Sequence, residues 1–183
     1  MQESRIKIKS FRIYSLLAAS LIVLSSFVIP QKNPSTKETI VYIFLSETCP
    51  ICQSYTLTLK ELYKKYSNKN VKFVGVFPNY YADVDSIKLF KEKYSIPFEL
   101  IIDKSAELTK RFSATITPEV FVENSEKQLL YSGRIDDSFY AIGKRRKVIT
   151  SNDLDYALSV ITNNEVIKSH KTQAVGCIIS ISK

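Results

Sequence analysis

Hydrophobic positions after residue 38 follow two patterns in turn. Short runs of β-branched and aromatic residues are typical of buried strands, and apolar residues three or four positions apart are typical of helices that cover a sheet. The strand pattern occurs at residues 39–45, 71–77, 98–103, 119–123 and 128–133, the last two as a hairpin. The helical pattern occurs around residues 55–66, 83–94 and 106–112, and again after residue 150. This βαβαβαββα order predicts an α/β fold with a central mixed sheet and helices on both faces.

Two of the expected helices have a clear inward-facing side. In the helix over residues 83–94, that side holds Val84, Ile87, Phe90 and Tyr94. In the last helix, it holds Leu154, Ala157, Leu158 and Ile161. Thr150 and Asp153 have the spacing of a capping box, so the last helix is expected to start near Thr150.

The first thirty residues have a different character. Residues 1–12 carry four positive charges, and residues 13–30 carry no charge. This uncharged run of 18 residues is long for a signal-peptide core and just long enough to span a bilayer as a helix. It has no polar face, which argues against a buried core helix. The sequence therefore predicts a hydrophobic helix in residues 1–30 that is either a signal anchor or a cleaved signal peptide.

The charge pattern also predicts orientation and domain boundaries. The basic flank should stay in the cytoplasm, which places the rest of the chain on the extracytoplasmic side of a cell membrane. The protein would be single-pass, or periplasmic or secreted after cleavage, and disulfide chemistry is possible in such a compartment. Residues 31–38 are polar and include Pro34, so they are expected to be a linker before a domain at 39–183.

The composition is that of an ordinary globular domain. Hydrophobic residues make up 45% and charged residues 24% of the chain, so disorder is not expected. The net charge is +8, but no basic helix with base-reading residues stands out, so nucleic-acid binding is not expected either. Residues 144–147 are all basic and are expected to form an exposed loop. The sequence has no recognisable phosphate-binding loop, Ser-His-Asp set or carboxylate pair.

The candidate chemistry lies in the stretch "SETCPICQSY", residues 46–55. Cys49 and Cys52 stand three positions apart in a chain with only 3 cysteines. A structural metal site needs four soft ligands, and the remaining candidates, His170 and Cys177, lie more than a hundred residues away. A disulfide across two residues closes a tiny loop and stabilises little, which argues against a purely structural role. A redox pair fits best, and a metal site is kept as an alternative.

The motif lies where a strand ends and a helix begins. Cys49 is expected at the first helical turn, where free backbone N–H groups and the helix dipole favour a thiolate. Pro50 suits that turn because its missing N–H would have no partner there. Cys52 lies one turn further along and is expected to be more shielded. Cys49 would attack a substrate disulfide, and Cys52 would resolve the mixed disulfide.

The strand, C-P-x-C motif and helix, followed by Thr117-Pro118 before another strand, resemble the thioredoxin-like superfamily. The resemblance implies a thioredoxin-like fold with Pro118 in the cis form, facing the cysteines. It also implies that the Thr117 backbone pairs with a bound substrate, with Pro50 and Ile51 as further substrate contacts. The implied activity is thiol–disulfide exchange, with a redox-active disulfide and no other cofactor.

The C-terminal part resembles one branch of this superfamily, the redoxin-domain proteins grouped with alkyl hydroperoxide reductase and thiol-specific antioxidant proteins. The stretches that carry this resemblance are residues 133–137, 144–147, 153–158 and 176–179. Tyr42 stands where peroxiredoxins carry a proline ahead of the reactive cysteine, so peroxide reduction is kept as an alternative. Ile43 stands where many thioredoxins carry a buried acid, so no proton acceptor for Cys52 is evident.

Two further residues are candidates for accessory roles. Cys177 is either a third redox partner or a small buried residue on a tail strand, and Arg134 either stabilises a thiolate or pairs with Asp136 and Asp137 as a clamp. The sequence thus predicts a monomeric, membrane-tethered oxidoreductase that exchanges disulfides with protein thiols and is reset by a partner protein. The alternatives are a thiol peroxidase, a metal-binding or metallochaperone module, and a redox-silent interaction domain.

Overall fold

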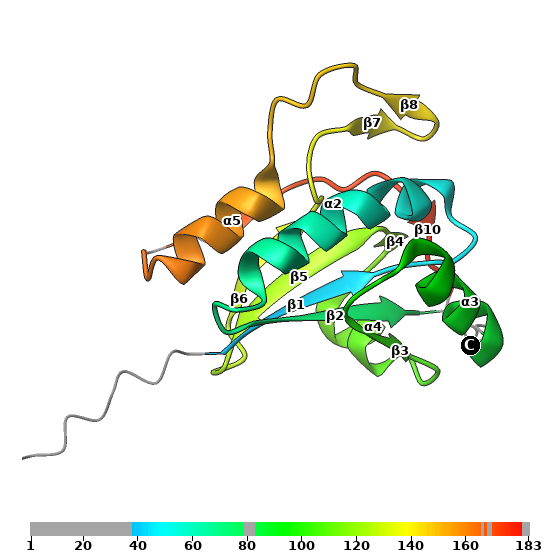
Figure 1. Cartoon of the computed structure of the whole chain (residues 1–183), viewed down its shortest axis with the longest axis horizontal. Helices are drawn as coiled ribbons and strands as arrows, with labels where there is room; N and C mark the ends of the chain where they lie inside the picture. Colours follow the sequence, from blue (N-terminus) through cyan, green and yellow to red (C-terminus); the bar gives the residue numbers. More distant parts are fainter. Residues whose placement is uncertain (1–37, 79–82, 166, 168–169, 181–183) are drawn as a thin grey trace, which may run out of the picture. The chain divides into compact units, whose positions relative to one another are not determined.

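The computed structural model describes residues 38–78, 83–165, 167 and 170–180 (Figure 1). The helices are α2 (Pro50–Tyr66), α3 (Val84–Tyr94), α4 (Glu107–Phe112) and α5 (Asp153–Thr162). The longer strands are β1 (Thr39–Phe44), β2 (Val71–Phe77), β3 (Glu99–Ile102), β5 (Glu119–Asn124) and β6 (Leu129–Gly133). The shorter strands are β4 (Ile116–Thr117), β7 (Phe139–Ala141), β8 (Lys144–Arg145), β9 (His170–Lys171) and β10 (Cys177–Ile178). The predicted order of longer strands and helices is confirmed, and the short strands are added to it.

A mixed six-stranded sheet in the order β3-β2-β1-β5-β6-β9 forms the centre of the fold. β1 lies inside the sheet, parallel to β2 and antiparallel to β5. The apolar residues of β1 suit this place because both faces of the sheet are covered, and Val41, Ile43 and Phe44 are fully buried. The loop after β1 therefore starts from the middle of the sheet, and it leads directly to the two cysteines.

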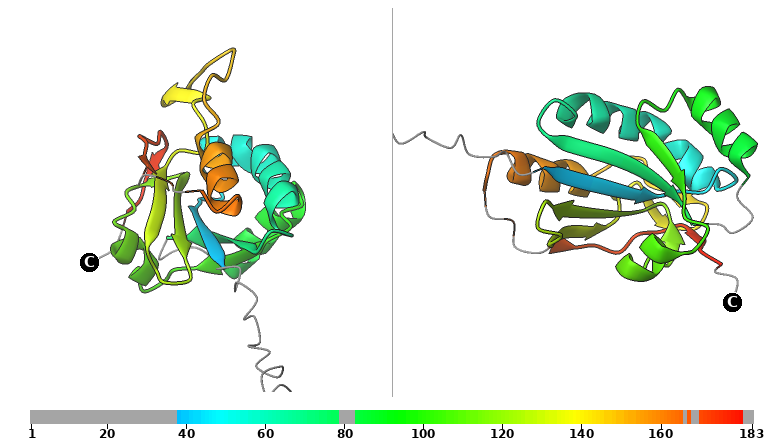
Figure 2. Two further views of the ribbon diagram at one scale, coloured as in Figure 1. Left: turned by 90° about the vertical axis from the view of Figure 1, so that its left-hand side faces the viewer. Right: turned by 90° about the horizontal axis from the view of Figure 1, so that it is seen from below.

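Helices cover both faces of the sheet, as predicted (Figure 2). α2, α3 and α5 contribute to one large core on the same face. α4 covers the other face, where the Phe112 ring lies 6.1 Å from the Phe44 ring and 4.9 Å from the Phe121 ring. The inward side predicted for the last helix is confirmed for its three fully buried residues, Leu154, Ala157 and Leu158, and Ile161 is half buried.

Two predictions about the surface need correction. Val84, expected on the inward-facing side of its helix, is 61% exposed. As the first residue of α3, it lies beyond the turn where Ile87 and Phe90 reach the core. The basic residues 144–147 are exposed as predicted, but they do not form a simple loop. β8 pairs antiparallel with β7, so the basic stretch begins as one arm of a short hairpin.

The predicted capping box of the last helix is wrong. α5 starts at Asp153 with Asn152 as its N-cap residue, and no side chain caps it. Thr150 donates hydrogen bonds from its backbone N–H and its hydroxyl to the Asp137 carboxylate instead. Asp153 binds Arg134, so both members of the expected box are held by partners distant in sequence.

The hydrophobic helix predicted in residues 1–30 lies outside the described residues, as does the linker predicted at residues 31–38 apart from its last residue. Of the helices in the described part of the chain, none has the length and apolar character needed to cross a bilayer.

Candidate active site

Cys49 lies at the junction between the loop after β1 and helix α2. It is the N-cap residue, with extended backbone angles (φ −76°, ψ 117°), and its carbonyl accepts a hydrogen bond from the Gln53 N–H at 3.1 Å. Pro50 takes the first helical position, where a backbone N–H would have no partner. The next two backbone N–H groups, those of Ile51 and Cys52, donate to the Cys49 sulfur. The start of the helix thus presents donors to this one atom.

The Thr117–Pro118 peptide bond is cis, as the resemblance predicts. It follows β4 and leads into β5, which is a neighbour of β1 in the sheet. The register between these two strands places Phe44, the last residue of β1, opposite Glu119, the first residue of β5. The end of β1 and the start of β5 therefore lie side by side next to the site. The Cys49 sulfur lies 3.4 Å from the Thr117 carbonyl oxygen, across 68 positions of sequence, and only the protonated thiol donates a hydrogen bond to that oxygen.

The two cysteines of the motif have opposite acidities. A hydrogen bond from the Cys52 thiol, followed by bonds from the Cys177 thiol and the two backbone N–H groups, lowers the pKa of Cys49 to about 5 against the effect of burial. Burial raises the pKa of Cys52, and its hydrogen bond to Cys49 and the Cys49 charge raise it further. The Ser46 N–H donates to the Cys52 sulfur at 3.5 Å, which opposes this rise without reversing it. At neutral pH, Cys49 is therefore a thiolate and Cys52 a thiol.

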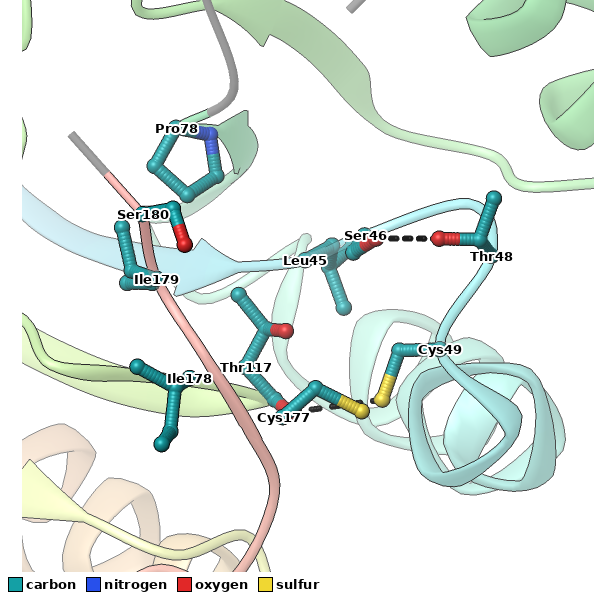
Figure 3. A pocket seen from close by; sticks show the side chains of 10 residues that line it. All are labelled: Leu45, Ser46, Thr48, Cys49, Pro78, Thr117, Cys177, Ile178, Ile179 and Ser180. Carbon is teal, nitrogen blue, oxygen red and sulfur yellow. Dashed lines mark hydrogen bonds between the residues drawn. The ribbon is translucent and has the colours of Figure 1, made fainter. Parts of the chain in front are cut away.

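Cys177 brings a third sulfur atom to the site. It is half buried, and all three cysteines are free thiols in this structure. Figure 3 shows its sulfur facing that of Cys49. Burial, together with the hydrogen bond to Cys49 and the Cys49 charge, raises the pKa of Cys177 to about 11.

A cavity of about 250 Å³ lies next to Cys49 (Figure 3). Besides Cys49, its lining residues are Leu45, Ser46, Thr48, Pro78, Thr117, Cys177, Ile178, Ile179 and Ser180. Pro50, a predicted substrate contact, is exposed beside Cys49. Ile51, the other predicted contact of the motif, is only 5% exposed because its side chain packs in the core under α2. Its side chain therefore does not line the cavity.

Arg134 and His170 are engaged elsewhere. The Arg134 Nε donates to Asp153 Oδ2 at 2.7 Å, so its clamp partner is not one of the two aspartates that the sequence suggested. His170 lies on β9 with its ring stacked against Tyr131, at a centroid distance of 6.1 Å. Within the described ranges, no three His, Cys, Asp or Glu side chains are grouped so that they could hold a metal ion. The four-ligand set considered from the sequence is not brought together here.

Two contributors to the site had no clear signal in the sequence. One is the backbone N–H of Ser46, because a backbone donor leaves no mark in residue types. The other is Gly176, where an added Cβ would lie 2.0 Å from the Thr117 carbonyl oxygen. The sequence indicates the stretch at residues 176–179 only through its family resemblance. The contact between Gly176 and Thr117 spans a long stretch of sequence, so the fold decides it.

Comparison with known proteins gives matches in sequence and in structure. Residues 24–149 match the sequence model of the AhpC/TSA family. The chloroplastic peroxiredoxin Q of Suaeda salsa is 26% identical over 74 residues, 40% of this chain and 33% of that protein, so the chain spans about a third of this curated relative. An uncharacterized conserved protein from Geobacillus kaustophilus superposes with a TM-score of 0.70 and 21% identity, over 80% of this chain and 79% of that chain. The thioredoxin domain of a thiol-disulfide oxidoreductase from Bacteroides vulgatus does so with a TM-score of 0.52 and 13% identity, over 69% and 80%.

The similar structures share the mixed sheet and its flanking helices, and they show that the fold is thioredoxin-like. The family match covers more than half of the chain and includes Cys49, Cys52 and the cis-proline Pro118. The chain therefore belongs to the AhpC/TSA family.

Proposed function

We propose that this protein is a thiol–disulfide oxidoreductase that works by dithiol–disulfide exchange at Cys49 and Cys52. The observation that carries the proposal is the position of Cys49, at the start of α2 and with its sulfur 3.4 Å from the carbonyl oxygen of Thr117, the residue that precedes the cis-proline Pro118. Its pKa of about 5 supplies the thiolate that attacks disulfides at neutral pH. Cys52, one helical turn further and fully buried, supplies a thiol for the second step.

The exchange proceeds in two balanced steps. The Cys49 thiolate attacks one sulfur of a substrate disulfide, so that a mixed disulfide forms and the other substrate sulfur leaves as a thiolate. Cys52 then gives up its proton and attacks the Cys49 sulfur, which releases the second substrate thiol and leaves a Cys49–Cys52 disulfide. A partner protein dithiol must reduce this disulfide before the next cycle. The Cys49 and Cys52 sulfurs supply the two electrons that reduce the substrate disulfide, so this chemistry requires no cofactor.

The substrates that fit this chemistry are protein disulfides and thiols. The Thr117 backbone lies beside Cys49, and Pro50 is exposed next to it, so both are proposed to contact an approaching polypeptide. Cys49 is only 2% exposed, and the cavity bordered by Ser46, Thr48 and Pro78 is the proposed route by which such a polypeptide reaches its sulfur. Arg134 has no proposed role in the exchange, since Asp153 holds its guanidinium.

We further propose that the domain acts at the extracytoplasmic face of a membrane, held there by residues 13–30. The uncharged run of these residues and the four basic residues before it support this placement. Such a compartment is one in which protein disulfides form and persist, which matches the proposed substrate class.

Reduction of insulin disulfides by dithiothreitol, followed as turbidity, tests the proposed exchange. The native chain should accelerate the reaction, and Cys49→Ser should reduce the rate to that of dithiothreitol alone because no other thiol is ionised at neutral pH. Leu57→Ala, a change on the exposed side of α2 that leaves every sulfur and the cavity lining in place, is the matched control for folding. Equal rates for the native chain and Cys49→Ser would overturn the proposal and favour a redox-silent domain.

A thiol-dependent peroxidase is a second candidate, because the matched stretch of the curated relative belongs to a protein named as a peroxiredoxin. The same acidic Cys49 could attack a peroxide oxygen and become a sulfenic acid, which Cys52 would then convert to a disulfide with release of water. The test is the consumption of hydrogen peroxide by the reduced chain. A rate faster than that of free dithiothreitol, which Cys49→Ser abolishes, would favour this activity over exchange with insulin.

A further inference from the structure

The last described segment of the chain lies across the candidate active site. β10 pairs antiparallel with β4, and Cys177 lies directly opposite Thr117. The ladder continues with the Ile179 N–H, which donates to the Thr115 carbonyl at 2.9 Å. The chain's own tail therefore occupies the backbone edge beside Cys49, and it forms one wall of the cavity there.

Gly176 is what allows the tail to lie so close to this edge. A Cβ added to it would lie 2.0 Å from the Thr117 oxygen and 2.6 Å from the Thr117 carbonyl carbon. Because these are backbone atoms next to a strand, they cannot move aside, and any residue with a side chain would push the tail away. Gly176 directly precedes Cys177, so the close approach also decides where the third sulfur lies.

The tail is anchored a second time before it reaches the site. The Thr172 N–H donates to the Ser132 carbonyl at 2.9 Å, and the Thr172 hydroxyl lies 2.7 Å from the Tyr131 hydroxyl. The Arg134 N–H donates to the same Thr172 hydroxyl at 3.0 Å. Both ends of the stretch from 172 to 179 are thus fixed to the domain, which gives Cys177 a high effective concentration at Cys49.

We propose that residues 176–179 form a built-in substrate strand, and that Cys177 on this strand is a third catalytic cysteine that forms a disulfide with Cys49. This inference rests on the proposed exchange function and adds a branch to it, in which Cys177 takes the place of Cys52 as the thiol that resolves the mixed disulfide. Cys52 and Cys177 both hydrogen-bond to the Cys49 sulfur, so they are alternative partners for it. A foreign polypeptide must displace the strand or approach from the opposite wall of the cavity.

The disulfide exchange in this branch involves only Cys49, Cys177 and the foreign thiol, and it needs no further oxidant or reductant. Burial is the largest cause of the raised pKa of Cys177, followed by the hydrogen bond to Cys49 and the Cys49 charge. When Cys49 carries a mixed disulfide, its sulfur is no longer charged, so these last two causes no longer oppose ionisation of Cys177. The Cys177 thiol then loses its proton to solvent and attacks the Cys49 sulfur. The bond between Cys49 and the foreign sulfur breaks, the Cys49–Cys177 bond forms, and the foreign group leaves as a thiolate.

The full chain with Cys52→Ser, reduced and then treated with oxidised glutathione, isolates this step. Cys49 should first take up one glutathione, and Cys177 should then expel it, so that mass mapping of the alkylated, digested protein finds a Cys49–Cys177 disulfide as the main product. Overall, two protein thiols are oxidised and one oxidised glutathione becomes two thiols. Adding Cys177→Ser to this background should leave the glutathione adduct on Cys49.

Gly176→Ala in the Cys52→Ser background tests the strand separately from the sulfur. The displaced tail should lower the yield of the Cys49–Cys177 disulfide by about tenfold or more, because the effective concentration of Cys177 falls. Gln173→Ala is a change in the same tail, and within the described residues the Gln173 side chain bonds only the adjacent Ala174 carbonyl, so this variant should cross-link like its parent.

Three results would overturn the inference. A stable glutathione adduct on Cys49 without cross-linking in Cys52→Ser would refute the branch while leaving the exchange function intact. An unchanged yield of the cross-link in Gly176→Ala would refute the role of the strand. Failure of Cys49 to react with oxidised glutathione at all would refute both the branch and the proposed function.

Discussion

The acidity of Cys49 results from a competition between hydrogen-bond donors and burial. Four donors converge on its sulfur: two thiols and two backbone N–H groups at the start of α2. Burial opposes ionisation, but the donors outweigh it, so the pKa falls to about 5. For Cys52, burial is the largest cause and raises the pKa, and its hydrogen bond to Cys49 and the Cys49 charge raise it further. One turn of helix therefore separates an acidic sulfur from a protonated one.

This balance predicts the pH dependence of alkylation at Cys49. In the reduced protein, the rate of reaction with iodoacetamide should rise with pH through a midpoint of about 5, since only the thiolate reacts. Cys52→Ala should move the midpoint upward, and by more than Cys177→Ala does, because the bond from Cys52 is the larger cause. Mass spectrometry of the Cys49 peptide measures both effects. A midpoint unchanged by Cys52→Ala would show that the acidity has another origin.

At the scale of elements, α2 has two tasks, because it positions Cys49 and closes the main core. The side of the helix that faces the sheet includes Leu59, which is fully buried, whereas Leu57 is 61% exposed. Lys64 and Lys65 in the last turn suit the negative end of the helix dipole. The site thus depends on a helix whose stability comes mainly from packing along one side.

Leu59→Ala should lower the free energy of unfolding by about 2–5 kcal/mol, because it removes buried methyl groups and leaves a cavity. Leu57→Ala, the same substitution on the exposed side of α2, should change it by only about 0.5 kcal/mol or less. Urea unfolding of the reduced domain, followed by circular dichroism, gives both values. Similar losses for the two variants would contradict the packing of α2 described above.

At the scale of the whole molecule, the proposed anchor decides where the chemistry takes place. A domain with three free cysteines, one of them acidic, meets many disulfides on the extracytoplasmic side and few in the cytoplasm. Tethering would also confine the domain to the membrane surface, where the proposed resetting partner protein has to meet it.

Expression of the full chain in a bacterial cell tests the anchor. After alkaline carbonate washing, the full-length protein should stay in the membrane pellet, and protease added to spheroplasts should digest the domain. Leu21→Lys with Val23→Lys should abolish the membrane association, since each charge near the centre of a spanning helix costs about 2.5–3.5 kcal/mol. Intact full-length protein in the soluble fraction would contradict anchoring, and a shortened soluble protein would indicate signal cleavage instead.

Local patterns explain why so much of the fold could be predicted. The strands β1, β2 and β3 and the helix α2 were recognised because their side chains follow the period of a strand or a helix over several residues. The position of Cys49 at a helix start follows from the same pattern, because a strand-forming run ends just before it and Pro50 suits the next position. Short elements such as β4 and β7 have too few residues to show a period.

The sequence by itself determined the order of the main elements, the cysteine motif and its place at a helix start, because these depend on neighbours within a few positions. Only the tertiary structure decided which distant groups meet: the Thr117 carbonyl at Cys49, Asp153 at Arg134, and Cys177 beside the motif. Those contacts depend on strand register and on the path of the tail, which the backbone of Gly176 permits. Such contacts involve backbone atoms or long sequence separations, and neither leaves a periodic signal in the chain.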